Sequence, residues 1–179
     1  IDDFPRATPD DMALAMQVMK SLDVPLLVHA ELDDSDGVAH YAEHKLPEPY
    51  SSYLKSRPDS WEINAVKTVI GLSAQYGCRT HIVHLSAAGA VPDIIAAQKK
   101  GVQISVETCP HYLTFAAEDI ADGDTRFKCA PPVRERSNQE KLWQHLKADA
   151  IDFVVSDHSP CTPHLKLINE GDFEHAWGG

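Results

Sequence analysis

The chain has 179 residues, of which 43% are hydrophobic and 24% charged, and these proportions are typical of one soluble globular domain. Its formal net charge of −11 offers no basic surface to a phosphate backbone, and no apolar run approaches the roughly 20 residues that a membrane-spanning helix needs. We therefore expect neither a nucleic acid nor a membrane as a partner.

Four cysteines are spread along the chain without any CxxC pair: Cys78, Cys109, Cys129 and Cys161. This spacing favours free thiols in a reducing compartment over a disulfide framework or a cysteine metal site. No signal peptide is recognisable in the first residues, so the cytoplasm is the expected location, with an organelle as the alternative.

The first predicted element is a helix that begins after Thr8, a suitable N-cap residue that Pro9 follows in the first turn. Three methionines then recur at helical spacing, and we interpret them as core packing rather than as a ligand site: Met12, Met16 and Met19. A continuously apolar run follows over 24–29, as expected for a strand that is buried on both faces.

Helical and strand-like stretches alternate along the rest of the chain. Helices are predicted over 58–76, where Gly77 suits the C-terminal stop, over 90–100, and from a capping box formed by Ser137 and Glu140. The remaining strands are predicted at 80–84, 102–107 and 151–156.

Strands separated by helices indicate right-handed crossovers and a parallel sheet, so the predicted fold class is α/β. Two longer segments, 31–56 and 110–136, follow the carboxyl ends of predicted strands, where the loops of an α/β barrel carry the active site. Four strand–helix units make half of an eight-stranded barrel. A small open sheet and part of a longer barrel protein are both compatible with this pattern, and the lack of a terminal element in the last residues favours the second.

Three side chains that could bind a metal ion follow separate predicted strands. His29 ends the first strand, His84 ends the second and Asp157 follows the fourth. A parallel barrel gathers such strand ends around one opening, although these residues are far apart in sequence. Imidazole and carboxylate suit Zn²⁺ and related ions, which lower the pKa of a bound water to about 7. A metal-dependent hydrolytic site is one interpretation of this pattern, and ordinary core or loop packing of the strand-end residues is the other. The pattern alone does not decide between His81 and His84 as the ligand, and His84, nearer the strand end, is the one we favour.

The other histidines fall into three groups. His81 shares its predicted strand with His84, and we expect it on the opposite face, packed against a helix. His111 and His158 lie near strand ends, where they could orient a ligand or donate to a substrate. The remaining five are interpreted as solvated or loop residues: His40, His44, His145, His164 and His175.

Five motifs occur in order along the chain: VHAE at 28–31, HLS at 84–86, ETCPHY at 107–112, CAPPVR at 129–134 and SDHSPC at 156–161. Together they resemble the cyclic-amidohydrolase branch of the amidohydrolase superfamily, which contains allantoinases, hydantoinases, dihydropyrimidinases and dihydroorotases. Within this branch, the opening IDDFP, the stretch 156–163 and the final AWGG are most similar to the allantoinase family. The resemblance covers essentially the whole chain.

The resemblance implies a partial (β/α)8 TIM barrel, in which residues 1–179 supply about strands five to eight with their helices. It implies a binuclear centre, usually with two Zn²⁺ ions per site. His29 and His84 match the histidine ligands of strands five and six, and Asp157 matches the strand-eight aspartate, which is both ligand and proton shuttle.

The same resemblance implies where a substrate lies and what the chain lacks. Four residues match positions where family members hold the cyclic amide: Ala130, Ser159, Trp177 and Gly178. A His-x-His pair, a carboxylated lysine that bridges the metals, and a small β-sandwich domain are expected outside this chain. We therefore expect the isolated segment to be inactive.

The implied reaction is the ring opening of allantoin to allantoate, in purine catabolism, by an enzyme that the family likeness makes a homotetramer. Hydantoinase, dihydropyrimidinase or dihydroorotase activity is the alternative within the same chemistry. A non-catalytic, dihydropyrimidinase-like scaffold protein is the alternative from another class, and the presence of all three predicted ligands argues against it.

Overall fold

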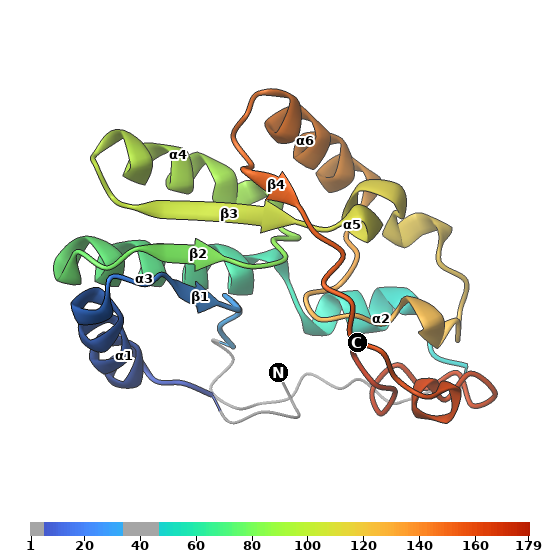
Figure 1. The fold of residues 1–179 in the computed structure, drawn as a ribbon. Coiled ribbons are helices and arrows are strands. Elements are labelled where there is room, and N and C mark those ends of the chain that lie inside the picture. Colours follow the sequence, from blue (N-terminus) through green and yellow to red (C-terminus); the bar gives the residue numbers. More distant parts are fainter. Residues whose placement is uncertain (1–5, 34–46) are drawn as a thin grey trace.

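The computed structural model describes residues 6–33 and 47–179 of the chain (Figure 1). Its strands form one parallel sheet in the order β1-β2-β3-β4, with β1 at Leu26–Val28, β2 at Thr80–Ile82, β3 at Ile104–Thr108 and β4 at Phe153–Val154. Each strand pairs with the next one along the chain, so the order never reverses as it does in a doubly wound sheet. An unreversed order of parallel strands is the arrangement of a (β/α)8 barrel.

Six α-helices are present in the described residues: α1 Pro9–Leu22, α2 Tyr50–Ser56, α3 Asp59–Tyr76, α4 Val91–Lys99, α5 Pro110–Thr114 and α6 Arg136–Lys147. Helix α3 packs on β2 and lies between α1 and α4, while α4 packs on β3. Figure 1 shows α3 and α4 behind the sheet, and α2, α5 and the C-terminal segment beyond the ends of the strands. The strand ends therefore open toward loops and short helices.

The start of α1 agrees with the sequence prediction. The Thr8 hydroxyl accepts the Asp11 backbone N–H, and the Asp11 carboxylate accepts the Thr8 backbone N–H. This pair forms a capping box, because each side chain satisfies a backbone donor of the other residue. Met16 is completely buried and the other two methionines pack against the core, so the interpretation of all three as core residues is confirmed.

The predicted capping box of α6 is wrong. The helix begins at Arg136 with Glu135 as its N-cap residue, so Ser137 lies inside the first turn instead of before it. The Glu118 carboxylate accepts the Arg136 backbone N–H at 2.9 Å and caps the helix from outside. A partner 18 residues away cannot be recognised from a local four-residue pattern.

The two faces of the sheet have different environments. Val28, Ile82 and Val106 share one register and are buried beneath the helices. On the opposite face, Leu27 pairs with His81, and Leu27 is 61% exposed. In a barrel this second face is the interior, so an exposed leucine there indicates that the sheet is only part of its barrel.

The prediction that His81 packs against a helix is also wrong. Its Nδ1 lies 2.8 Å from the Ser105 hydroxyl, its Nε2 lies 2.9 Å from a Glu107 carboxylate oxygen, and its ring stacks on Phe153. These partners come from the inner face of the sheet. Strand β2 ends at Ile82 and His84 has a φ of 41°, so the two-residue alternation does not extend from His81 to His84.

Three smaller expectations have mixed outcomes. All four cysteines are free thiols, as predicted. His164 and His175 are exposed, whereas His145 is half-buried in α6, and His40 and His44 lie outside the described residues. Within the described residues, no helix is long and apolar enough to cross a membrane.

Candidate metal centre

The imidazoles of His29 and His84 meet at the ends of β1 and β2. His29 directly follows β1 and His84 lies two residues beyond β2, and the parallel register pairs Val28 with Ile82. His29 Nδ1 lies 2.9 Å from His84 Nε2, and the two ring planes are inclined by 64°. The structure therefore brings together two of the three predicted ligands, although 55 residues separate them.

The geometry of this pair fits a bound divalent ion. A tetrahedral zinc ion bound at about 2.0–2.1 Å by two nitrogens would hold them about 3.3 Å apart, close to the spacing found here. His29 Nε2 lies 3.2 Å from a Glu31 carboxylate oxygen, so its proton is directed away from the pair. His84 Nδ1 is buried and has no hydrogen-bond partner among the described residues. Without an ion the facing nitrogens are within hydrogen-bond distance of each other, and they can share an ion when the proton of His84 lies on Nδ1.

The environment keeps His84 neutral. Burial and, after it, the neighbouring His29 lower the pKa of His84 to about 4, although the charges of Asp157 and Glu107 act in the opposite direction. A neutral imidazole retains the nitrogen lone pair that metal binding requires.

Asp157 lies near this pair and is exposed at the end of β4. Its charge raises the pKa of both His84 and His111, so its carboxylate is within electrostatic reach of both rings. Asp157 has a φ of 47° and His84 a φ of 41°, a left-handed conformation that Asp and His adopt more readily than most other side-chain-bearing residues.

The two histidines predicted to assist the site differ in their surroundings. His111 lies in the first turn of α5, half-buried, with its ring against Tyr112. Burial lowers the pKa of His111 despite the opposing effect of Asp157. His158 is exposed beside Asp157. Of the two, His111 is the better placed to act on a group held at the strand ends.

The four residues predicted to hold a substrate come together from three segments of the chain. The Ala130 backbone N–H donates to the Gly178 carbonyl at 3.2 Å. A Cβ atom added to Gly179 would lie 2.5 Å from Trp177 Nε1 and 2.9 Å from Ser159 Oγ, so both side chains lie against this glycine. The cluster thus brings Ala130 and Ser159 close in space to Trp177 and Gly178.

The backbone around Ala130 is held by side-chain hydroxyls that sequence reasoning missed. Four hydroxyl groups donate to its carbonyls at 2.6–2.8 Å: Tyr53 to Cys129, Tyr112 to Pro131, Ser86 to Pro132 and Tyr50 to Val133. Among the carbonyls of residues 129–133, only that of Ala130 accepts no hydrogen bond from the described part of the chain. These contacts cannot be predicted from a local sequence pattern, because each one joins segments that are distant in sequence.

A buried ion pair, also missed, supports the segment that follows His84. Arg134 donates to one Glu62 oxygen at 2.6 and 3.0 Å, and the other Glu62 oxygen accepts the backbone N–H groups of Ser86 and Ala87 at 2.9 and 3.1 Å. Burial raises the pKa of Glu62, but four N–H donors fill both oxygens, which only the ionised carboxylate can accept. The burial of Glu62 could have been predicted from the sequence, because Glu62 lies four residues before Val66, on the buried face of the same helix.

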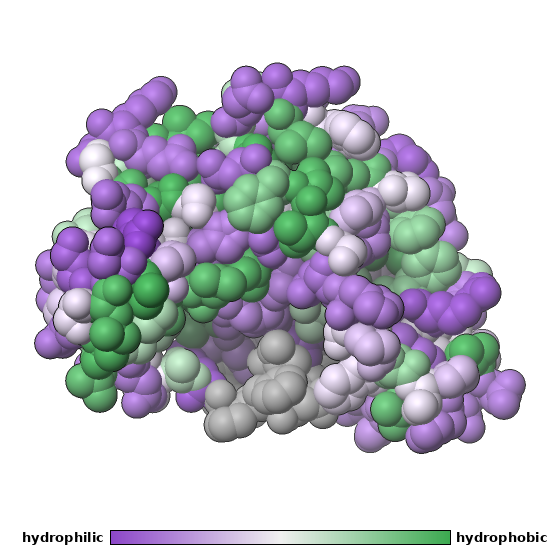
Figure 2. Space-filling view, in the orientation of Figure 1, coloured by the Kyte–Doolittle hydropathy of each residue, from purple (hydrophilic) through white to green (hydrophobic). Residues whose placement is uncertain are grey.

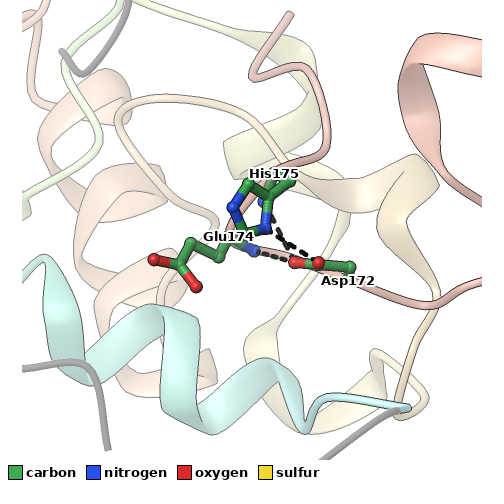
Figure 3. Close-up of side chains that lie close together, drawn as sticks. All are labelled: Asp172, Glu174 and His175. Carbon is green, nitrogen blue, oxygen red and sulfur yellow. Dashed lines mark hydrogen bonds and ion pairs between the residues drawn. The ribbon is translucent and has the colours of Figure 1, made fainter. Parts of the chain in front are cut away.

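A second cluster of possible metal-binding groups contains Asp172, Glu174 and His175 (Figure 3). The Asp172 carboxylate already accepts the backbone N–H groups of Glu174 and His175, and it also pairs with His175 Nδ1 at 2.9 Å. The possible ligand atoms of the three residues lie within 4.8 Å of one another, but the carboxylate of Asp172 already has these partners. We therefore interpret this group as a turn stabilised by Asp172.

Comparisons with solved structures define the class of protein. No protein-family model matches the chain. An L-hydantoinase (dihydropyrimidinase) from Arthrobacter aurescens superposes with a TM-score of 0.82 at 25% identity, over 98% of this chain and 39% of that one. A D-hydantoinase from a Bacillus species superposes with a TM-score of 0.81 at 30% identity, over 97% and 39%. The chain therefore has the α/β fold of part of a TIM barrel of the hydantoinase type, as predicted.

Comparisons with curated proteins are more specific. The allantoinase of Arabidopsis thaliana is 46% identical and aligns with 100% of this chain and 37% of its own length. The mitochondrial allantoinase of Aquarana catesbeiana is 45% identical and that of Saccharomyces cerevisiae 43%, again over 100% of this chain and over 36% and 39% of their own lengths. The chain is thus a homologue of the allantoinases along its whole length and spans less than two fifths of theirs.

The buried ion pair yields a stability prediction. Replacing Arg134→Met leaves the Glu62 carboxylate buried beside only backbone donors, and breaking such a pair costs about 3–5 kcal/mol of unfolding free energy. Urea unfolding measures this loss. The matched control, Arg126→Met, removes an exposed pair with Asp124 and should leave the midpoint unchanged. A midpoint for Arg134→Met equal to that of the control would contradict the assignment.

Proposed function

We propose that the protein containing this chain hydrolyses a cyclic amide, and that its substrate is allantoin, which it opens to allantoate in purine catabolism. The observation that carries the proposal is the convergence of His29 Nδ1 and His84 Nε2 at 2.9 Å, at the carboxyl ends of parallel strands. Homology to allantoinases over the whole chain supports the choice of substrate.

In this proposal, His29, His84 and Asp157 bind the metal. Two Zn²⁺ ions per site are proposed, with the carboxylated lysine that bridges them, and the remaining ligands, contributed from outside this chain. When bound, the ions supply Lewis-acid polarisation of the ring carbonyl and an acidified water. The donor set of two imidazoles and one carboxylate is of the kind that binds Zn²⁺.

Asp157 moves the proton in the proposed reaction. Its carboxylate accepts a proton from the attacking water as the new C–O bond forms, and it passes that proton to the ring nitrogen as the C–N bond breaks. The exposed position of Asp157 at the open end of β4 gives a substrate access to it. His111, within reach of its charge, is proposed to orient this carboxylate, and the adjacent His158 to border the site.

The ring is proposed to bind at the cluster of Ala130, Ser159, Trp177 and Gly178. The Ala130 carbonyl has no hydrogen-bond partner among the described residues, so it is available to a ring N–H. The rigid support of its neighbours by four hydroxyls fixes the direction of that carbonyl. Such a contact favours a cyclic amide over a substrate that lacks the ring N–H, because the second substrate would leave the carbonyl unpaired.

The chain is proposed to supply strands five to eight of the barrel, with the N-terminal half of the barrel and a β-sandwich domain outside it. Figure 2 shows an apolar patch over α1, where the exposed side chains of Leu14, Val18 and Leu22 follow one another at four-residue spacing. A stripe of this kind is normally covered by a neighbouring helix. We further propose a homotetramer located in the cytoplasm, with an organelle as the alternative because one relative is named mitochondrial.

Hydantoinase or dihydropyrimidinase activity is the second candidate, because the superposed structures carry those names. Their identity to this chain is 25–30%, against 43–46% for the allantoinases. Dihydroorotase activity and a non-catalytic scaffold have no comparable support, and a scaffold would not need the facing imidazoles.

Substrate profiling of the full-length protein tests this function. We expect zinc-loaded protein to hydrolyse allantoin with a higher kcat/KM than hydantoin, dihydrouracil or dihydroorotate. Hydrolysis of dihydrouracil without turnover of allantoin would replace the first candidate by the second, and absence of all four activities together with absence of bound metal would favour the scaffold.

Replacing Asp157→Asn should lower kcat for allantoin by about 10²–10⁴-fold, because the amide cannot accept and return a proton. The fold should be unaffected, since this side chain is exposed. Steady-state kinetics and circular dichroism check both statements. The control is Asp149→Asn, an exposed aspartate after α6 that also has a positive φ. Equal kcat values for the two variants would exclude Asp157 from the reaction.

The proposed completion of the barrel predicts the effect of a charge on α1. Val18→Glu in the full-length protein should lower the unfolding free energy by at least about 2 kcal/mol, because a preceding helix would bury the new carboxylate. Gln17→Glu, on the exposed side of the same helix, is the matched control. If chemical denaturation gives the same midpoint for both variants, the stripe is solvent-exposed and the proposed packing is wrong.

A further inference from the structure

His29 has a carboxylate partner that no family motif assigns a role. Glu31 lies two residues beyond His29, and its Oε2 accepts the His29 Nε2–H at 3.2 Å. Because an ionised carboxylate only accepts hydrogen bonds, this contact places the proton of the ring on Nε2. The other nitrogen, Nδ1, is then left unprotonated and faces His84.

Glu31 is itself held in place. Its side chain is 2% exposed, and Arg57 Nη1 lies 3.5 Å from the same oxygen that accepts from His29. The same carboxylate oxygen thus lies between the His29 ring N–H and the Arg57 guanidinium, so two partners hold the Glu31 side chain in one orientation.

The support continues toward the second imidazole. Arg134 donates to the Arg57 backbone carbonyl at 3.1 Å and to Glu62, whose other oxygen accepts the N–H groups of Ser86 and Ala87. The four buried charged residues Glu31, Arg57, Glu62 and Arg134 thus connect the His29 side chain to the backbone just after His84. These four residues therefore hold the two imidazole rings in a fixed position relative to each other.

Packing alone does not explain a carboxylate at position 31. Its second oxygen, Oε1, is buried without a hydrogen-bond partner among the described residues. An unmatched buried acceptor is costly, so packing by itself does not favour a carboxylate here. The contacts with His29 and Arg57 are the features that an apolar residue could not reproduce.

We propose that Glu31, anchored by Arg57, is a positioning residue that fixes the tautomer and orientation of His29 for metal binding. The inference rests on the proposed function, since it takes His29 as a ligand. Carboxylates that hold metal-binding histidines in this way typically account for 10–100-fold in metal affinity.

Zinc affinity tests the inference without any measurement of activity. Zn²⁺ alone is titrated into metal-free full-length protein in competition with a chromophoric chelator. Glu31→Ala should bind the ion that depends on His29 about 10–100-fold more weakly. Glu31→Gln should recover most of the affinity, since its amide oxygen still accepts the Nε2–H. Glu31→Leu keeps the packing and should be as weak as Glu31→Ala, which separates orientation from folding.

Two further variants separate the inference from the function on which it rests. Ser73→Ala removes a buried hydroxyl bonded to the Cys78 carbonyl, remote from the strand ends, and should bind Zn²⁺ as the wild type does. His29→Ala should lose the ion. If it does, and both Glu31→Ala and Glu31→Leu bind normally, the role of Glu31 is wrong while the metal site stands. If His29→Ala also binds normally, the metal site itself is wrong, and the inference fails with it.

Discussion

The parallel register of β1 and β2 is the constraint on which the site depends. It pairs Val28 with Ile82, so His29, directly after β1, and His84, two residues after β2, emerge side by side. A shift of one residue would turn His29 toward the helices, because successive side chains alternate between the faces of a strand. The helix-facing row of Val28, Ile82 and Val106 resists this shift, since it would expose buried apolar side chains. Core packing beneath the sheet therefore determines where the imidazoles meet above it.

Buried polar contacts hold the loops that follow the strands and carry the rest of the site. The chain turns away from β2 in a left-handed conformation at His84, and the next N–H groups are held by Glu62. The segment around Ala130 is irregular and depends on side-chain hydroxyls for its carbonyl partners. Loops that carry a site in an α/β barrel lack the regular hydrogen bonds of strands, and here buried tyrosines, a serine and an ion pair take their place.

Periodicity and strand-end position were sufficient to predict the alternation of elements, the fold class and the proximity of His29 to His84. Those features depend on local patterns together with one rule, that parallel strands end at the same edge. The place of His81 was predicted wrongly because the strand is shorter than its apolar run, so alternation was extended past the true end at Ile82. The α6 cap was missed because the carboxylate that accepts the Arg136 backbone N–H belongs to Glu118, in another segment.

The contacts that support the site could not be predicted for the same reason. Arg134 and Glu62 are 72 residues apart, and Tyr50 and Val133 are 83 apart. Only the folded chain shows which of many buried groups face one another. Glu31 is the intermediate case, since it lies two residues from His29 in sequence, but its burial and its pairing with Arg57 are properties of the fold.

The proposed site requires one divalent ion between two specific imidazole nitrogens. It can be tested by a crystal structure of the zinc-loaded full-length protein with data collected at the zinc absorption edge. We expect an anomalous peak about 2.0–2.1 Å from both His29 Nδ1 and His84 Nε2. Zinc bound only elsewhere, for example at Asp172 and His175, or imidazoles turned into separate layers, would contradict it.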